Sequence, residues 1–184
     1  MSAGFVVWLT GLSAAGKSTI GRIVGDELER RGLLVDRLDG DVVRQHLSAG
    51  LGFSKEDRDT NIARIGWVAS RLARAGVAVI VSAISPYEEA RRRARALTEG
   101  EHAVFVEVYV ATSLEECARR DPKGLYAKAY AGELAEFTGV SDPYEPPSSP
   151  EIRIETEGRS PQESARIVIE QLVALGLLSD EAAA

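Results

Sequence analysis

The chain has 184 residues, 45% of them hydrophobic, and a formal net charge of −6 at neutral pH. This length suits one domain with a substantial core. The acidic balance excludes general nucleic-acid binding, which requires a broad basic surface. The first residues do not form a signal peptide, and no segment is long enough to span a membrane. We therefore expect a cytoplasmic protein that binds neither nucleic acid nor a membrane.

Apolar segments rich in β-branched residues alternate with amphipathic segments along the chain. The first kind predicts strands, and the second, with apolar residues three or four apart, predicts helices. Five alternations favour a single α/β domain over residues 1–184, with a five-stranded parallel sheet covered by helices on both faces. The predicted strands are 5–10, 33–38, 77–83, 104–110 and 152–156, and the predicted helices are 17–31, 60–75, 86–98, 113–120 and 161–176.

The first predicted strand is followed by GLSAAGKS, residues 11–18, which fits the G-x-x-x-x-G-K-[ST] pattern of a phosphate-binding loop. Backbone N–H groups of such a loop surround the β-phosphate of a nucleotide. Lys17 is expected to face solvent in the empty loop and to reach the β- and γ-phosphates, and the Ser18 hydroxyl to bind magnesium. The motif predicts phosphate binding and leaves the reaction open.

The predicted strand over 77–83 lacks the terminal aspartate that helps to hold magnesium in many phosphate-loop proteins. The guanine-binding N-K-x-D motif is also missing, which argues against a switch GTPase. The preceding strand instead ends in LDGD, residues 38–41. Residues two apart in an extended segment point the same way, so Asp39 and Asp41 can both face the phosphate site.

One of these carboxylates would hold a magnesium-bound water, and the other would orient an acceptor hydroxyl for attack. We favour this catalytic interpretation because the usual acid is missing elsewhere. The alternative is that Asp41 only caps a helix that begins at Val42.

Two arginines and an asparagine follow the aspartates at helical spacing. Arg44 lies three residues after Asp41, and Arg58 and Asn61 are three apart at the start of the next helix. Such a group suits an anionic ligand, and Phe53 could stack on a nucleobase. Taken singly, an arginine or a phenylalanine fits a surface or core position better.

Three further features have simpler interpretations. The single cysteine, Cys117, excludes an intrachain disulfide and is expected to be buried. Residues 88–97, EEARRRARAL, predict a solvated helix face. The longest irregular stretch covers 121–150, and an excursion of this length is usually functional or disordered.

Together these segments resemble the adenylylsulfate kinase (APS kinase) family over nearly the whole chain. As a set they are much more specific than the phosphate-binding loop alone. The matching segments are GLSAAGKST (11–19), LDGDVVR (38–44), LGFSKEDRDTNIARI (51–65), AISPY (83–87), FVEVYV (105–110), RDPKGLYAKAYAGE (120–133) and FTGVSDPYEPP (137–147).

The resemblance implies a P-loop NTPase fold with a mobile lid over roughly 121–142. It also implies magnesium-dependent transfer of the γ-phosphoryl group of ATP to the 3′-hydroxyl of adenylyl sulfate, giving 3′-phosphoadenylyl sulfate and ADP. We further expect a homodimer and association with an ATP sulfurylase.

The resemblance also assigns roles to individual residues. The phenylalanines that match Phe53 and Phe137 sandwich the adenine of the acceptor, and Lys123 reaches into the site from the lid. The implied catalytic residues are Lys17, Asp39, Asp41 and Ser85, and the metal site uses Ser18 and, through water, Asp39. The implied ATP site comprises Gly11, Ser13, Ala14, Ala15, Gly16, Lys17, Ser18, Thr19 and Arg119, and the acceptor site comprises Asp41, Arg44, Phe53, Arg58, Asn61, Ile84, Ser85, Lys123, Gly124, Leu125 and Phe137.

The serine that matches Ser85 is often described as a phosphoserine intermediate in this family. A covalent serine would need its own base and a second in-line geometry, and the sequence offers no base beside it. We therefore expect direct transfer, with Ser85 positioning the acceptor.

Several positions depart from the family pattern. Ala14 stands where glycine is common, and because alanine resists positive φ we expect it at negative φ. Ala83 removes bulk beside the acceptor. Ala127 and Tyr130 stand where basic residues are common, so the lid should contribute less positive charge to ATP binding.

Two other functions fit parts of the pattern. One is a kinase of the same fold that acts on another nucleotide or on a sugar acid; the aromatic pair Phe53 and Phe137 favours a nucleobase instead. The other is a catalytically silent nucleotide-binding domain, like those attached to some sulfurylases. The intact Lys17, Asp39 and Asp41 argue against it.

Overall fold

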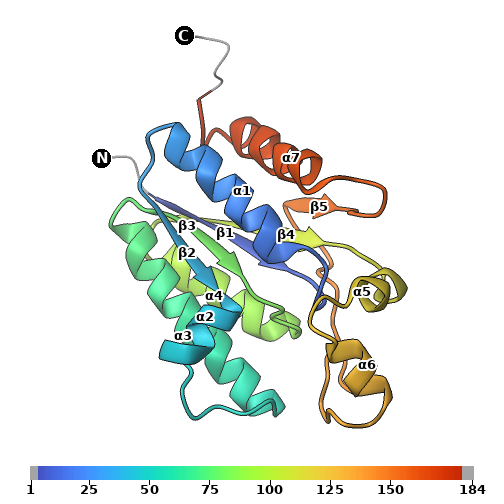
Figure 1. Ribbon diagram of the computed structural model, residues 1–184. Helices are drawn as coiled ribbons and strands as arrows, with labels where there is room; N and C mark the ends of the chain where they lie inside the picture. Colours follow the sequence, from blue (N-terminus) through green and yellow to red (C-terminus); the bar gives the residue numbers. More distant parts are fainter. Residues whose placement is uncertain (1–3, 180–184) are drawn as a thin grey trace.

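The computed structural model describes residues 4–179, which form a five-stranded parallel sheet with helices on both faces (Figure 1). The strand order is β2-β3-β1-β4-β5. The predicted α/β fold is confirmed, and strand boundaries differ from the predictions by at most two residues. The strands are β1 (Phe5–Thr10), β2 (Val35–Asp39), β3 (Ala78–Ser82), β4 (Val104–Val110) and β5 (Ile152–Ile154).

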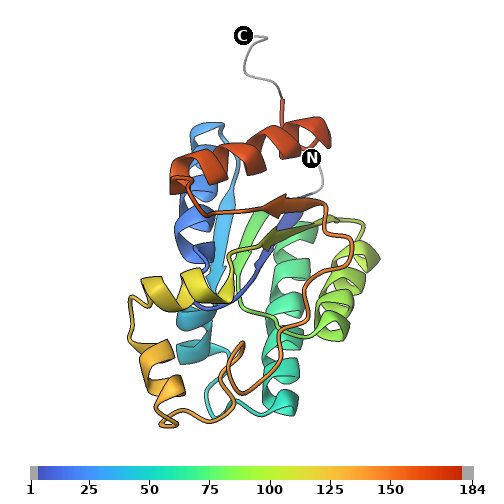
Figure 2. The ribbon, with the colours of Figure 1, turned by 90° about the vertical axis from the view of Figure 1, so that its right-hand side faces the viewer.

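Four long helices form the outer layers. Helices α1 (Lys17–Arg30) and α7 (Pro161–Ala174) cover one face, and α3 (Lys55–Arg74) and α4 (Glu88–Gly100) cover the other (Figures 1 and 2). The first turn of α3 was missed, because its polar residues lack the apolar spacing that predicts a helix. The Ser54 side chain caps α3 by accepting a hydrogen bond from the Asp57 N–H.

Three shorter helices lie beyond the carboxyl ends of the strands. These are α2 (Gly40–His46), α5 (Leu114–Arg120) and α6 (Leu125–Tyr130). Helix α6 lies within the stretch expected to be irregular, so that expectation is wrong for these six residues. Within residues 4–179, no helix is both long and apolar enough to cross a membrane.

The central strand β1 divides the core into two halves. Its alternate residues Phe5, Val7 and Leu9 pack with α1 and α7, whereas Val6 and Trp8 pack with α3 and α4. All of these side chains are buried. Because both faces are covered, the strand is continuously apolar, as expected for a parallel sheet between helical layers.

Helix α4 differs from the prediction of a solvated face. Its outer arginines pair with glutamates one turn away in solvent, but Ala90 and Ala94 are buried against α3 and β-strand side chains. Arg91, only 2% exposed, lies inside the protein opposite Glu107. A charge-rich helix therefore carries one fully buried guanidinium.

The register of the sheet sets the position of the active-site segments. Leu9 of β1 and Asp39 of β2 both pair with Ser82 of β3. The three strands therefore end at the same level, and the segments that follow them emerge side by side. Ligands of open parallel sheets bind at this carboxyl edge.

Candidate active site

The loop between β1 and α1 has the backbone of a phosphate-binding loop. A Cβ at Gly11 would lie 2.6 Å from the Val110 carbonyl oxygen, so no larger residue fits there. Gly16 has a φ of 108° at the start of α1. Ala14 has a φ of 60°, so the expectation of a negative φ is wrong. The loop imposes this left-handed turn on alanine at a cost of about 1–2 kcal/mol.

Residues that follow β4 in the chain hold this loop in place. The Thr112 hydroxyl donates to the Ala15 carbonyl at 2.9 Å, and the Tyr126 hydroxyl of α6 donates to the Ser13 carbonyl at 3.0 Å. Neither contact could be predicted from the sequence, because neither residue belongs to a motif that indicates contact with the loop.

Lys17 is buried in the loop instead of facing solvent, which corrects the prediction. Its ammonium group donates to the carbonyl oxygens of Gly11 at 2.9 Å and Leu12 at 2.7 Å. Burial lowers the pKa of Lys17 to about 8, although the charges of Cys117 and Asp39 act in the opposite direction. The loop thus holds a poorly solvated cation where phosphate oxygens are expected.

Ser18 and Asp39 lie next to each other between the phosphate-binding loop and β2. The Ser18 hydroxyl donates to Oδ2 of Asp39 at 2.5 Å, and Oδ1 of Asp39 accepts from the Asp41 N–H at 3.0 Å. Asp39 therefore caps α2, which begins at Gly40; the alternative that Asp41 caps a helix at Val42 is wrong.

The Ser18–Asp39 pair suits a hard cation. Hydroxyl and carboxylate oxygens are the ligands that Mg²⁺ accepts, and it usually completes its shell with water and substrate phosphates. Within residues 4–179, no group of three or more His, Cys, Asp or Glu side chains is arranged to hold a metal by itself. The donor set fits a metal that arrives with a nucleotide.

Asp41 pairs with the loop that precedes α6. Its carboxylate forms an ion pair with the ammonium group of Lys123, in the loop that precedes that helix. Both side chains are more than half exposed. A residue of the expected lid therefore already contacts one of the two predicted acids, and Gly124 and Leu125 follow at the N-terminus of α6.

Phe53 and Arg44 form a cation–π pair beside α2. The Arg44 guanidinium carbon lies 4.4 Å from the Phe53 ring centroid, and Phe53 as a residue is 56% exposed. Nη1 of Arg44 also donates to the Gly52 carbonyl at 3.3 Å. Burial lowers the pKa of this guanidinium. Arg44 thus covers a face of the Phe53 ring on which a nucleobase could stack.

Arg58 and Asn61 are both buried at the start of α3. Arg58 donates to the Phe53 carbonyl at 2.7 Å and to the Thr138 hydroxyl at 2.6 Å, and also to the Glu136 carbonyl. Its donors are thus used to attach the 136–138 segment to α3. Asn61 accepts from the Ser48 hydroxyl.

Phe137 packs edge-on against Tyr126, with the ring centroids 5.0 Å apart. The two predicted aromatic residues therefore have different partners: Phe53 contacts arginine, and Phe137 contacts the ring that also holds the phosphate-binding loop.

The segment after β3 directs Ser85 inward. Ser85 is 1% exposed and has a φ of 42°. Its hydroxyl accepts a hydrogen bond from Trp8 Nε1 at 3.0 Å and lies 3.3 Å from the Ala83 carbonyl, to which it donates. The Ile84 carbonyl accepts from the Thr10 hydroxyl at 2.7 Å. The Ser85 hydroxyl and the Ile84 carbonyl are therefore both engaged within the protein.

The two arginines of α5 differ in position. Arg119 is largely exposed and bonds Glu116 at 2.7 and 2.8 Å. Arg120 reaches back toward the Ala15 carbonyl, 3.5 Å from its Nη1. In this conformation the second arginine is the one directed at the phosphate-binding loop.

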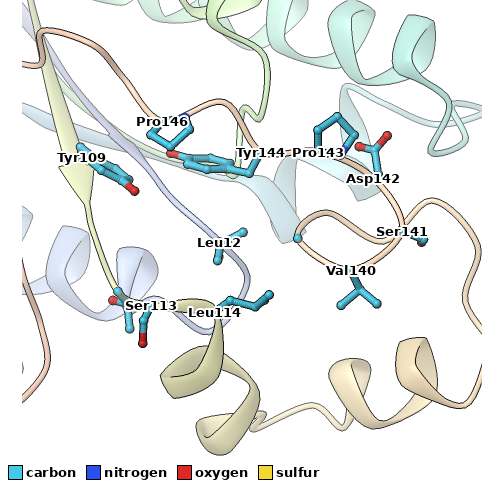
Figure 3. Close-up of a pocket in the computed structure, with 12 residues that line it drawn as sticks. Leu12, Tyr109, Ser113, Leu114, Val140, Ser141, Asp142, Pro143, Tyr144 and Pro146 are labelled. Carbon is cyan, nitrogen blue, oxygen red and sulfur yellow. The ribbon is translucent and has the colours of Figure 1, made fainter.

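A pocket of about 580 Å³ lies beside the loop (Figure 3). It lies between Leu12, Leu114 at the start of α5, and the 139–146 segment, with Tyr109 and Tyr144 at one side. None of the residues predicted to bind ATP or the acceptor lines it. The pocket is therefore not the predicted substrate site.

A phosphate-binding loop, an acid-bearing segment and a cluster of arginines meet at the carboxyl edge of a parallel sheet, which defines a P-loop kinase. The chain belongs to the adenylylsulphate kinase family, whose model matches residues 3–155.

Similarity to individual proteins and to a solved structure supports this membership. The adenylyl-sulfate kinase of Halothermothrix orenii is 52% identical over 176 residues, covering 96% of this chain and 93% of that protein. That of Chloroflexus aurantiacus is 56% identical over 155 residues, covering 84% and 81%. The solved structure of an APS kinase from Mycobacterium tuberculosis in complex with AMPPNP and APS superposes with a TM-score of 0.91 at 45% identity, covering 94% and 99%.

The lowered pKa of Lys17 predicts a pH-dependent stability difference. Lysine titrates near pH 10.4 in an unfolded chain and near pH 8 here. Between these values the folded protein binds fewer protons than the unfolded one, so its stability rises with pH. From pH 7 to about pH 9.5, the wild type should gain about 2 kcal/mol over Lys17→Met.

Urea unfolding of both proteins at the two pH values measures this difference, because groups common to both cancel. Lys128→Met, on an exposed position of α6, is the control. A stability difference between wild type and Lys17→Met that stays the same at both pH values would contradict the buried, depressed lysine.

Proposed function

We propose that this chain transfers the γ-phosphoryl group of ATP to the 3′-hydroxyl of adenylyl sulfate, giving 3′-phosphoadenylyl sulfate and ADP. The observation that carries the proposal is the convergence at one sheet edge of Lys17, the Ser18–Asp39 pair and the Lys123–Asp41 pair. These are residues that match the family motifs in a chain of that family.

On the ATP side, Lys17 would exchange its two loop carbonyls for β- and γ-phosphate oxygens. Loop N–H groups and the start of α1 would bind the phosphates. Mg²⁺, held by Ser18 and through water by Asp39, would supply charge neutralisation when bound. The remaining proposed ATP contacts are Gly11, Ser13, Ala14, Ala15, Gly16, Thr19 and Arg119.

On the acceptor side, adenylyl sulfate would lie between α2, α3 and the loop before α6. Its adenine would displace the Arg44 guanidinium from Phe53, which frees that cation for the anionic part of the substrate. Phe137 would close on the other face of the base. The further proposed contacts are Arg58, Asn61, Ile84, Ser85, Lys123, Gly124 and Leu125.

Asp41 would orient the acceptor hydroxyl during transfer. Its carboxylate is exposed at the sheet edge, and its partner Lys123 would be released to the transferring phosphoryl group. The engagement of the Ser85 hydroxyl by Trp8 supports direct transfer without a phosphoserine.

We also infer the domain organisation and the partners of the chain. The chain would form a single kinase domain over 1–184, with a lid over roughly 121–142 that closes on both substrates. It would form a homodimer and associate with an ATP sulfurylase. The cytoplasmic location also stays a prediction.

Coupled measurement of ADP release tests the proposed reaction. With ATP and Mg²⁺, addition of adenylyl sulfate should stimulate ADP release strongly, and adenosine 5′-monophosphate should not replace it. ADP release that does not depend on adenylyl sulfate, or that follows a sugar acid instead, would refute the assignment.

Asp41→Asn separates catalysis from metal binding. If Asp41 orients the hydroxyl mainly in the transition state, kcat should fall about 10²–10⁴-fold while KM for ATP changes little. Asp36→Asn, at an exposed position of β2, is the matched control and should retain wild-type kinetics. If only the KM for ATP rises, Asp41 serves the metal instead.

Phe53→Ala tests the stacking platform. Loss of one aromatic surface costs a stacked base about 1–3 kcal/mol, so the affinity for adenylyl sulfate should fall roughly tenfold to hundredfold. ATP affinity should stay within about twofold. Calorimetric titration of adenylyl sulfate in the presence of ADP, and of a non-hydrolysable ATP analogue by itself, measures the two affinities, with Trp67→Ala as an exposed aromatic control on α3. Normal binding of adenylyl sulfate to the Phe53 variant would refute the platform.

A further inference from the structure

Arg91 is a buried cation that none of the steps above uses. It lies in the first turn of α4, and all three of its side-chain nitrogens donate hydrogen bonds. Nε bonds Oε1 of Glu107 at 2.8 Å, Nη1 bonds the Ser85 carbonyl at 2.7 Å, and Nη2 bonds the Glu145 carbonyl at 2.8 Å. The planar guanidinium group therefore joins three separate segments of the chain.

Two of these segments are far apart in the sequence. Ser85 follows β3 at the carboxyl edge, whereas Glu145 lies on the path that returns from α6 to β5. Further bonds join them: the Glu145 N–H donates to the Pro86 carbonyl at 2.8 Å, and the Glu88 N–H donates to the Glu145 carboxylate at 2.7 Å. We call this set of bonds, which includes those of the buried Arg91, the 85–145 clamp.

The clamp holds a backbone that would otherwise relax. Ser85 is a non-glycine residue with a φ of 42°, and such conformations persist only when the surroundings enforce them. The Arg91 guanidinium fixes the Ser85 carbonyl directly. Glu107 on β4 supplies the counter-charge that keeps the cation buried.

The clamp continues into the predicted acceptor site. The Tyr87 hydroxyl donates to both carboxylate oxygens of Asp142, at 2.9 and 3.1 Å. Asp142 belongs to the same turn as Thr138, which accepts from Arg58. Hydrogen bonds thus lead from Ser85 through the return path to Arg58.

We propose that Arg91 is a positioning residue for the acceptor. It fixes the Ser85 backbone and the 136–145 segment relative to each other, so that both can contact adenylyl sulfate at the same time. This inference rests on the proposed function. Arg91 itself touches no substrate and acts only through the two carbonyl groups that it holds.

Lysine at position 91 would keep the positive charge but lose the planar guanidinium group. A single ammonium group can pair with Glu107 but cannot reproduce the planar geometry that bridges both carbonyls. Arg91→Lys should therefore raise KM for adenylyl sulfate tenfold or more, whereas KM for ATP stays within about twofold.

Arg95→Lys is the matched control. Arg95 lies one turn further along α4 and also faces Glu107, at 3.9 Å, but its hydrogen bonds go to Glu151 and the Phe105 carbonyl. The same substitution there should leave both KM values unchanged. An equal rise in KM for adenylyl sulfate in the two variants would overturn the proposal, because the effect would then not depend on the two carbonyl groups that Arg91 holds.

Hydrogen exchange supplies a readout that does not depend on activity. In Arg91→Lys, the amides of residues 83–87 and 142–146 should exchange faster together, and in Arg95→Lys they should not. Exchange at wild-type rates in both segments would refute the clamp. A variant with a lower melting temperature but unchanged KM values would show a purely structural role and also overturn the proposal.

Tyr87→Phe serves if Arg91→Lys does not fold. It keeps the buried ring and removes only the bonds to Asp142. KM for adenylyl sulfate should rise about threefold, with ATP unaffected; an unchanged value would count against the clamp. Wild-type protein without adenylyl-sulfate-dependent ADP release would instead refute the proposed function, while the exchange data would still judge the clamp by itself.

Discussion

The equal level at which β1, β2 and β3 end is the constraint on which the site depends. Leu9, Asp39 and Ser82 pair in register, so the phosphate-binding loop, the Asp39–Asp41 segment and the Ser85 loop begin within reach of one another. A shift of β2 by one residue would turn Asp39 to the other face of the sheet and remove the partner of Ser18. Val35 and Leu38 of β2 pack against the two opposite halves of the core, which opposes such a shift.

Polar groups of the protein contact one another at the site. Lys17 binds loop carbonyls, Asp41 binds Lys123, and Arg44 covers Phe53. Each of these contacts uses a group that our proposal assigns to a substrate. Binding would therefore exchange internal contacts for substrate contacts, and the depressed pKa of Lys17 shows that its internal contacts do not fully compensate for burial. Phosphate oxygens would satisfy this cation better.

The sheet, the phosphate-binding loop and the Asp39–Asp41 segment could be predicted because periodicity and motif spacing are local properties. The burial of Arg91 could not, since it depends on Glu107 and Glu145, which lie on other segments of the chain. The burial of Lys17 was missed because the motif does not reveal that its ammonium group bonds two carbonyls of its own loop. The positive φ of Ala14 was missed because residue preference suggested the opposite, whereas the geometry of the loop prevails. Helix α6 was missed because its flanking glycines and prolines favour irregular structure.

A structure of the ternary complex with adenylyl sulfate and a non-hydrolysable ATP analogue would show whether these side chains exchange their internal contacts for substrate contacts. We expect the Lys17 ammonium to leave the Gly11 and Leu12 carbonyls for the β- and γ-phosphates. We also expect the 3′-hydroxyl of adenylyl sulfate to lie beside Asp41, with the adenine on Phe53. Adenylyl sulfate bound elsewhere, or with its 3′-hydroxyl turned away from Asp41, would contradict the proposed mechanism.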